Sequence, residues 1–228
     1  MDTPNLSPPP GFTGLNPNIP VSMYFRHLPH WRQPGATYFV TFRLADSLPQ
    51  EKLEVLRMFR ADWLRKNPTP KADALSKFSL ENMRRIEAWL DKGMGSCHLK
   101  EEIVSRELIE TMHHFDDVRY QLSCYVVMPN HVHVIVRPSF SDSADLEVIL
   151  RGWKGYSARG INRLLRRNGS LWQDESFDRI VRNEEHLYRA VQYIGANPLR
   201  AGLPKENWVR WIRPDWVLNG WSFSDEAK

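Results

Sequence analysis

The chain has 228 residues, 42% of them hydrophobic and 25% charged, which is enough apolar material for one substantial core and excludes a disordered chain. Its 31 basic and 27 acidic residues give a formal net charge of only +4, so the balance excludes a strongly acidic protein and mildly favours anionic partners. Cys97 and Cys124 lack metal-site spacing and predict no disulfide framework. No apolar run reaches the ~20 residues that cross a bilayer. The start of the chain also lacks a basic and apolar leader, so we expect a cytoplasmic protein that does not contact a membrane.

Three regions differ in composition along the chain. Residues 1–23 are rich in Pro, Asn and Gly, which favours a flexible N-terminal arm or an extended strap. Residues 24–205 are expected to form a single domain, and residues 206–228 a Trp-rich C-terminal tail. The tail tryptophans either cover an apolar sheet face or offer a ring to a displaced base; they are Trp208, Trp211, Trp216 and Trp221.

The first half of the chain predicts one strand followed by helices. The β-branched and aromatic stretch Ala36–Ala45 lies between turn residues and predicts a strand. From about 50 to 99 the apolar residues take helical spacing around the loop Lys66–Lys71, which predicts a helical insertion. A further helix is expected over Lys100–Phe115, where the closing histidines His113 and His114 suit the negative end of the helix dipole.

The second half predicts a strand pair, two helices and a short strand between them. Tyr120–Pro129 and His131–Pro138 predict antiparallel strands with a tight connection. A long helix is expected from about Asp145 to Arg167, a short strand within Leu171–Arg182, and a helix from Asn183 that stops at Pro198. This order predicts an α+β fold in which helices pack on a central, mostly antiparallel sheet.

The segment from Arg151 to Ser170 carries six basic residues and no acidic one. A solvated helix face is one interpretation, and contact with nucleic-acid phosphates is the other. Spacings of three and four place several of the cations on one helical face. Trp172 and Gln173 follow this segment and are candidates either for base contacts or for the core. The candidate phosphate-binding residues are Arg151, Lys154, Arg159, Arg163, Arg166 and Arg167.

Two histidines interrupt the apolar stretch MPNHVHVIVRP. Side chains alternate along a strand, so His131 and His133 share a face about 7 Å apart along the strand, whereas the neighbouring valines line the other face. Two imidazoles at this spacing can hold one metal ion and leave coordination positions open, as a catalytic metal requires. The alternative is a histidine pair that is hydrogen-bonded at the surface of the sheet.

The helix that begins at Asn183 supplies a tyrosine and an amide on one face, because Tyr193 and Asn197 are four residues apart. Both side chains can therefore reach the same neighbouring surface. Pro198 disfavours helical geometry at the preceding residue, which predicts that Asn197 lies at a frayed helix end. The alternative is a core tyrosine and a helix-terminating asparagine.

MPNHVHVIV and YIGANPLRAG together resemble the transposases of the HUH superfamily, named for histidine, hydrophobic residue, histidine. More closely, the sequence resembles the REP-associated tyrosine transposases, which are single-tyrosine enzymes of the insertion-sequence type. The likeness also includes HLPHWRQPGATYFVTFRL and LWQDESFDRIVRNEEHL, so it covers most of residues 24–205. The resemblance implies a ferredoxin-like HUH fold and a bacterial, nucleoid-associated protein.

The resemblance also implies roles for the site residues. His131 and His133 would hold Mg²⁺ or Mn²⁺, Tyr193 would be the nucleophile, and Asn197 takes the position where relatives place a Gln or Asn near the metal. The implied function is a metal-dependent endonuclease and strand transferase for single-stranded, hairpin-bearing DNA, the form of palindromic REP elements. It would act through a 5′-phosphotyrosine intermediate without a nucleotide cofactor. A monomer and a homodimer both fit.

Three alternatives remain open from the sequence. Tyr156 lies in the basic segment, where cations lower a phenol pKa, and is a rival nucleophile. The chain is alternatively a non-cleaving protein, derived from a transposase, that binds hairpin DNA or structured RNA, for which the basic segment and the tryptophans would suffice. Hydrolysis of a small substrate has little support, because no HExxH or serine motif accompanies the histidines.

Overall fold

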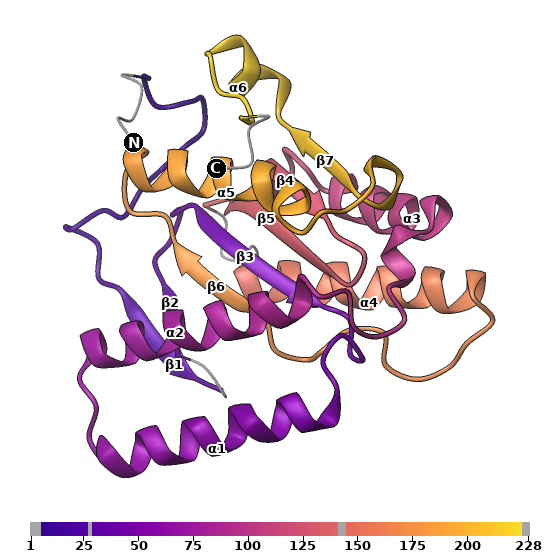
Figure 1. Ribbon diagram of the computed structural model, residues 1–228. Helices are drawn as coiled ribbons and strands as arrows, with labels where there is room; N and C mark the ends of the chain where they lie inside the picture. Colours follow the sequence, from indigo (N-terminus) through magenta and orange to yellow (C-terminus); the bar gives the residue numbers. More distant parts are fainter. Residues whose placement is uncertain (1–5, 27–28, 141–144, 225–228) are drawn as a thin grey trace.

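The computed structural model of the chain describes residues 6–26, 29–140 and 145–224 (Figure 1). The first five residues of the predicted arm and the last four of the predicted tail lie outside the described residues. The strands are β1 (Ser22–Phe25), β2 (Pro29–Arg32), β3 (Tyr38–Arg43), β4 (Tyr120–Val127), β5 (His131–Pro138), β6 (Phe177–Ile180) and β7 (Val209–Ile212). The α-helices are α1 (Gln50–Lys66), α2 (Ala72–Leu90), α3 (Glu102–His113), α4 (Leu146–Leu164), α5 (Glu184–Arg200) and α6 (Pro214–Leu218), and the 3₁₀-helices are η1 (His98–Lys100) and η2 (Lys205–Asn207).

Five strands form one antiparallel sheet in the order β6-β3-β5-β4-β7, while β1 and β2 pair separately. The path β3, α3, β4, β5, α4, β6 is a ferredoxin-like βαββαβ unit, with its first and third strands at the centre of the sheet. The predicted α+β class, with helices packed on a central antiparallel sheet, is therefore confirmed.

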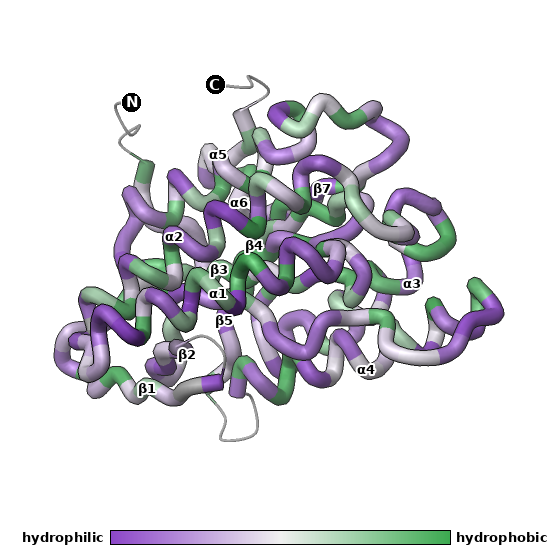
Figure 2. Tube along the Cα trace, turned by 60° about the horizontal axis from the view of Figure 1, so that its bottom comes forward, coloured by the Kyte–Doolittle hydropathy of each residue, from purple (hydrophilic) through white to green (hydrophobic). Residues whose placement is uncertain are grey.

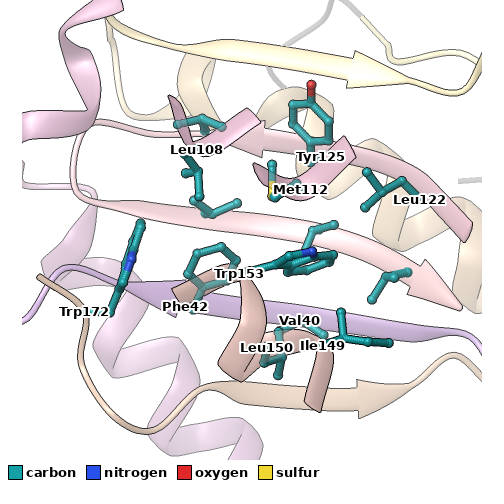
Figure 3. Packing of buried hydrophobic residues seen from close by; sticks show 14 of the residues in the cluster. Val40, Phe42, Leu108, Met112, Leu122, Tyr125, Ile149, Leu150, Trp153 and Trp172 are labelled. Atoms are coloured by element: carbon teal, nitrogen blue, oxygen red, sulfur yellow. The ribbon is translucent and has the colours of Figure 1, made fainter. Parts of the chain in front are cut away.

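The two faces of the sheet carry separate cores. Helices α3 and α4 cover one face, where Val40 and Phe42 of β3 meet Leu108 of α3 and Trp153 of α4 (Figure 3). Helix α5 and the C-terminal segment cover the other face. Phe39 and the residues of β3 that alternate with Val40 and Phe42 lie on this face. Because side chains alternate along β5, Val132, Val134 and Val136 belong to the first core and His131 and His133 point the other way.

Helix α5 runs further than its sequence predicts. It continues through Pro198 to Arg200, so the predicted stop at Pro198 is wrong. A proline in the last turn removes only one donor, and the Ala201 amide still donates to the Asn197 carbonyl at 3.1 Å. Asn197 is fully buried, not frayed, and keeps its alignment with Tyr193.

Helices α1 and α2 form an inserted hairpin between β3 and α3 (Figure 1). All residues of α1 are described, and none of them is buried. The helix is held to α2 by aromatic contacts: Trp63 and Phe59 stack on Phe78, with ring centroids 4.4 Å and 5.3 Å apart. Hydrophilic and hydrophobic residues alternate along this hairpin (Figure 2).

The two ends of the chain pack against each other. The indoles of Trp216 and Trp221 donate hydrogen bonds to the carbonyls of Pro10 and Ser7, at 2.9 Å and 3.0 Å. Trp208 is buried in the same core, so these rings cover an apolar sheet face, which was one of the two interpretations of the tail. Residues 6–21 form an extended strap over the body of the protein. Within the described ranges, no helix has the length and apolarity needed to traverse a lipid bilayer.

Candidate active site

The two histidines of β5 converge on one point. Their Nε2 atoms lie 3.0 Å apart, and the side chains are 1% and 0% exposed for His131 and His133. Two nitrogen ligands, each about 2.1 Å from one metal at a right angle, lie about 3 Å apart, so the separation suits a shared cation. Two bare ring nitrogens that face each other repel unless a proton or a cation lies between them.

Neighbouring side chains orient both rings. Nδ1 of His131 contacts Oδ1 of Asn130 at 2.8 Å, and the Asn130 amide nitrogen donates to the carbonyls of Leu90 and Met94 at 3.2 Å and 3.0 Å. The two donated bonds fix the Asn130 oxygen toward His131, so Nδ1 of His131 carries the proton and Nε2 keeps its lone pair. Nδ1 of His133 contacts the Thr41 hydroxyl, which either donates or accepts, at 2.8 Å.

Burial keeps both imidazoles neutral. It lowers the pKa of His131 to about 3, and the nearby Arg43 guanidinium contributes to the same shift. Burial also holds the pKa of His133 well below its usual value, with a further contribution from His131. Neutral rings with free Nε2 lone pairs are the form in which histidine binds a metal.

Helix α5 brings two further polar groups to the pair. The Tyr193 ring lies edge-on to His133, with centroids 5.3 Å apart, and Nδ2 of Asn197 lies 3.3 Å from Nε2 of His133. Among the described residues, neither the Tyr193 hydroxyl nor Oδ1 of Asn197 has a hydrogen-bond partner of normal geometry, although both are buried. Buried polar atoms are nearly always satisfied, so two orphans one turn apart on the same helix face indicate a place for a ligand.

The environment of Tyr193 makes its phenol a weak acid. Burial, followed by the Glu87 carboxyl of α2, raises the pKa of Tyr193 well above its usual value, and Arg200 acts in the opposite sense with its guanidinium 4.9 Å from the ring centroid. Burial in turn raises the pKa of Glu87 to about 7. Glu87 lies near the phenol without a hydrogen bond of normal geometry between them, and is the neighbouring group able to exchange a proton near neutral pH.

The donor set fits a divalent cation. Among the described residues, no three His, Cys, Asp or Glu side chains gather into a metal-binding group, so the two histidines need an amide or substrate oxygen beside them. The orphaned Asn197 oxygen meets this need, because exchanging the amide oxygen and nitrogen leaves the shape of the side chain unchanged. Imidazole ligands favour Mn²⁺ and other transition metals over Mg²⁺, which prefers oxygen.

A basic cleft leads to Tyr193 from between α2, β6 and α5. Its volume is about 550 Å³, and Glu87 and Phe39 line it beside the tyrosine. Four arginines at its walls give it a positive character that suits a phosphate backbone: Arg84, Arg179, Arg182 and Arg189.

The predicted DNA-binding cations lie on the other side of the sheet. Helix α4 packs on the core opposite the histidines, and Arg151, Arg159, Arg163 and Arg166 are exposed on it or just after it. Arg167 is partly buried and donates to the Ser170 carbonyl. Tyr156, the rival nucleophile, is 62% exposed on the same helix, so the sheet separates it from the histidine pair.

The other predicted contact residues have partners within the protein. The Lys154 ammonium donates to the carbonyls of Gln173 and Asp174, and burial lowers its pKa to about 8. Trp172 is 5% exposed, packs on Phe42 and donates to the Ser157 hydroxyl. The structure thus brings together His131, His133, Tyr193 and Asn197, and leaves the α4 group apart from them.

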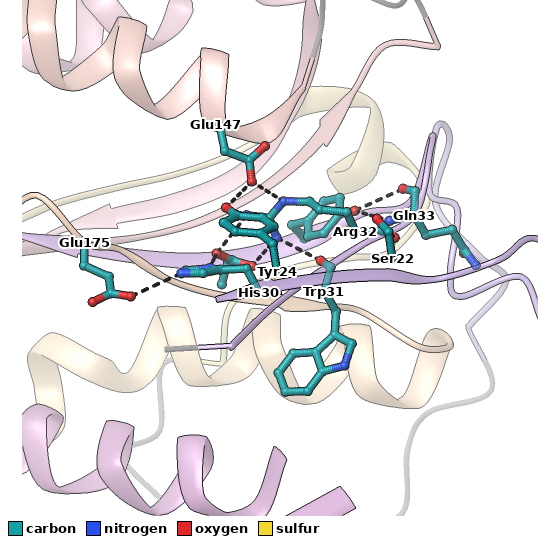
Figure 4. A network of polar contacts seen from close by, with 10 residues as sticks. Ser22, Tyr24, His30, Trp31, Arg32, Gln33, Glu147 and Glu175 are labelled. Carbon is teal, nitrogen blue, oxygen red and sulfur yellow. Dashed lines mark hydrogen bonds and ion pairs between the residues drawn. The ribbon is translucent and has the colours of Figure 1, made fainter. Parts of the chain in front are cut away.

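A polar network ties β2 to α4 and β6 (Figure 4). His30 lies between the carboxylates of Asp178 and Glu175, and Arg32 pairs with Asp178 and with Glu147 of α4. Burial alone lowers the pKa of His30, but the hydrogen bonds to the two carboxylates raise it to about 9. This network holds the start of α4 and the segment before β6 in place, and so supports the helix that carries the exposed arginines.

Some further residues of the site can be predicted from the sequence, and others cannot. Arg200 is detectable, because positions 193, 197 and 200 repeat at helical spacing on one face. Arg189 likewise lies one turn before Tyr193 on α5, whereas Glu87, Arg84 and Arg179 line the cleft through the tertiary packing of α2 and β6, and no local pattern marks them.

Comparisons with known proteins give likenesses among solved structures alone. No protein-family model matches the chain, and no curated protein matches it. Among solved structures, the chain is similar to a REP-associated tyrosine transposase bound to a REP hairpin, with 17% sequence identity and a TM-score of 0.44. The likeness covers 81% of this chain and 76% of that one.

Proposed function

We propose that the protein is a metal-dependent endonuclease and strand transferase that cuts single-stranded DNA beside a hairpin through a covalent bond to Tyr193. The observation that carries this proposal is the 3.0 Å separation of the two Nε2 atoms, with the Asn197 amide nitrogen 3.3 Å from one of them and the Tyr193 ring edge-on to the same histidine. Within the described part of the chain, these residues supply a nucleophile and three groups able to bind a metal.

The chain supplies the nucleophile and the proton acceptor. The Tyr193 oxygen attacks the phosphorus, the P–O3′ bond breaks, and the tyrosine becomes joined to the 5′-phosphate. The phenolic proton passes to the Glu87 carboxylate, whose pKa of about 7 suits the transfer near neutral pH. The departing oxygen takes up a proton and becomes a free 3′-hydroxyl. One phosphodiester replaces another, so the step is reversible and the strand can be rejoined or transferred.

His131, His133 and Asn197 would hold the cation. When bound there, a divalent ion supplies Lewis-acid polarisation of the scissile phosphate. Asn130 and Thr41 keep the ring nitrogens directed to it, and helix α5 keeps the phenol beside His133. The donor set favours Mn²⁺ over Mg²⁺.

Substrate entry requires the end of α2 to move. Both histidines are covered, and Asn130 binds the backbone carbonyls of Leu90 and Met94 at that end. The four arginines of the Tyr193 cleft neutralise the incoming backbone, and the arginines of α4 hold the hairpin from the opposite side of the sheet.

The decisive experiment is an adduct assay. The protein is incubated with Mn²⁺ and a labelled REP-type hairpin that carries a single-stranded tail, then separated by denaturing electrophoresis. We expect a covalent protein–DNA band from wild type and from Tyr156→Phe, and none from Tyr193→Phe or without the ion. A band that survives in Tyr193→Phe overturns the assignment of the nucleophile. Undiminished hairpin binding without a band under any divalent ion indicates the non-cleaving alternative.

A further inference from the structure

Arg43, at the end of β3, is a buried cation without an acidic partner. The residue is 9% exposed, and only its Nη1 atom is bonded, to the Ser47 hydroxyl at 3.0 Å and the Leu44 carbonyl at 3.4 Å. Nε and Nη2 have no acceptor among the described residues. Burial lowers the pKa of Arg43 to about 10, and no carboxylate within the described part of the chain offsets that shift. A largely buried charge without an acidic partner opposes folding, and Arg43 lines a cavity from which a ligand of opposite charge can reach it.

The side chain lies on the same face as the catalytic pair. Arg43 is directly opposite His131 in the β3–β5 register, two residues from the Thr41–His133 pair. Residues directly opposite on antiparallel strands project to one face of the sheet, so the guanidinium is adjacent to the histidines. Its contribution to the lowered pKa of His131 agrees with this proximity.

Arg43 points into a cavity beneath the α1–α2 hairpin. The cavity has a volume of about 510 Å³, and Thr41 and Leu90 line it next to the histidines. Two further arginines, Arg57 and Arg60 of α1, face the same space. Arg57 is paired with Glu54 and exposed, which leaves Arg43 as the buried cation of the cavity.

This cavity connects the two surfaces assigned to DNA. It shares Gln173, Glu175 and Ser176 with the groove beside α4 that Arg151 and Lys154 line. It shares Met83 and Phe177 with the basic cleft at Tyr193. The three cavities therefore adjoin one another, with Arg43 in the middle one.

We propose that Arg43 binds a phosphodiester of the single strand next to the one that is cut, and that the strand runs between the sheet and the α1–α2 hairpin. This inference rests on the proposed function for the identity of the strand. The free Nε and Nη2 donors match the paired oxygens of a phosphate in the side-by-side geometry that arginine favours.

The test combines Arg43→Gln and Arg43→Lys with single methylphosphonate substitutions along the tail of the hairpin oligonucleotide. We expect Arg43→Gln to raise KM for adduct formation roughly tenfold to a hundredfold, with a smaller change in kcat. Arg43→Lys should recover part of that loss. In wild type one methylphosphonate position should weaken binding, and the same position should have no further effect in Arg43→Gln. Arg106→Gln, which removes an exposed arginine of α3, is the matched control.

Thermal stability distinguishes phosphate binding by Arg43 from a purely structural role of this residue. Removing an unpaired buried charge should leave Tm unchanged or raise it, whereas removing a structural arginine lowers it. A lower Tm together with unchanged KM, or the absence of any coupled methylphosphonate position, overturns the proposal. If wild type forms no Tyr193-dependent adduct, the proposed cleavage fails. Tail-binding affinity, measured with the same oligonucleotides, then tests Arg43 by itself.

Discussion

The Thr41 hydroxyl lies 2.8 Å from Nδ1 of His133 and holds the ring with Nε2 toward His131. Unlike the oriented amide of Asn130, this hydroxyl can donate to a bare Nδ1 or accept from a protonated one. It therefore lets His133 carry its proton on Nε2 when no cation is present and on Nδ1 when one is bound. In the proposed function, Thr41 would orient a histidine that holds the cation without touching the cation itself.

Thr41→Val should weaken Mn²⁺ binding by about tenfold to a hundredfold, the usual loss when the hydrogen bond behind a ligand is removed. The measurement is a Mn²⁺ titration followed by electron paramagnetic resonance of the free ion. Thr37→Val, which removes another buried hydroxyl of this region, should leave the affinity unchanged. Equal losses in both variants would mean that Thr41 acts only through packing.

Glu87→Gln should abolish the pH dependence of adduct formation near neutrality. Burial raises the pKa of Glu87 to about 7, so the rate in wild type should rise as pH increases through that value. The variant should be about 10²-fold to 10⁴-fold slower, as expected for loss of a general base. Initial rates between about pH 5 and about pH 9 check this, with the exposed Glu81→Gln of α2 as control. If the rate of adduct formation by Glu87→Gln still falls at low pH as in wild type, another group accepts the proton.

The raised pKa of Glu87 also predicts that the stability of the protein falls as pH rises, whereas the rate of adduct formation increases. Its folded pKa lies above the unfolded value of 4.5, so the unfolded chain loses this proton first as pH rises. The contribution of Glu87 to the free energy of unfolding should therefore decrease between pH 4.5 and about 7. Urea denaturation across this window should give a flatter profile for Glu87→Gln than for wild type.

His30 predicts a loss of stability at higher pH. Its folded pKa of about 9 exceeds the unfolded 6.5, so its stabilising contribution is complete below pH 6.5 and disappears as pH rises through about 9. Urea denaturation of His30→Gln should lack this slope, and the exposed His114→Gln should retain it. A slope that persists in His30→Gln would place the titrating group elsewhere.

Replacement of Arg151, Arg159 or Arg163 by Gln should weaken hairpin binding without changing the chemical step. Each lost phosphate contact should reduce the slope of log K against log salt concentration by about one. Binding at several salt concentrations and adduct formation at saturating DNA check the two parts. An unchanged salt slope would make these cations a solvated face of α4.

Most of the fold can be predicted from the sequence, because the patterns that indicate strands and helices are local. Strand alternation separates His131 and His133 from the valines, and helical spacing pairs Tyr193 with Asn197. One exception is Pro198, whose local preference is outweighed by the packing of buried Asn197 and partly buried Leu199 at the end of α5, and another is the edge strand β7, which lies within the predicted tail. Glu87 and Arg43 could not be identified in advance, because their significance depends on how the hairpin folds back over the sheet.

The α1–α2 hairpin occupies one uninterrupted stretch between β3 and α3, and its outer helix contributes nothing to the interior. The strand order and the four converging side chains are encoded outside this stretch. The outer helix α1 can therefore vary in evolution more freely than α2, which carries Glu87 and the Leu90 carbonyl that binds Asn130. Lengthening or shortening α1 would change which strands are admitted, while the groups around Tyr193 stay in place.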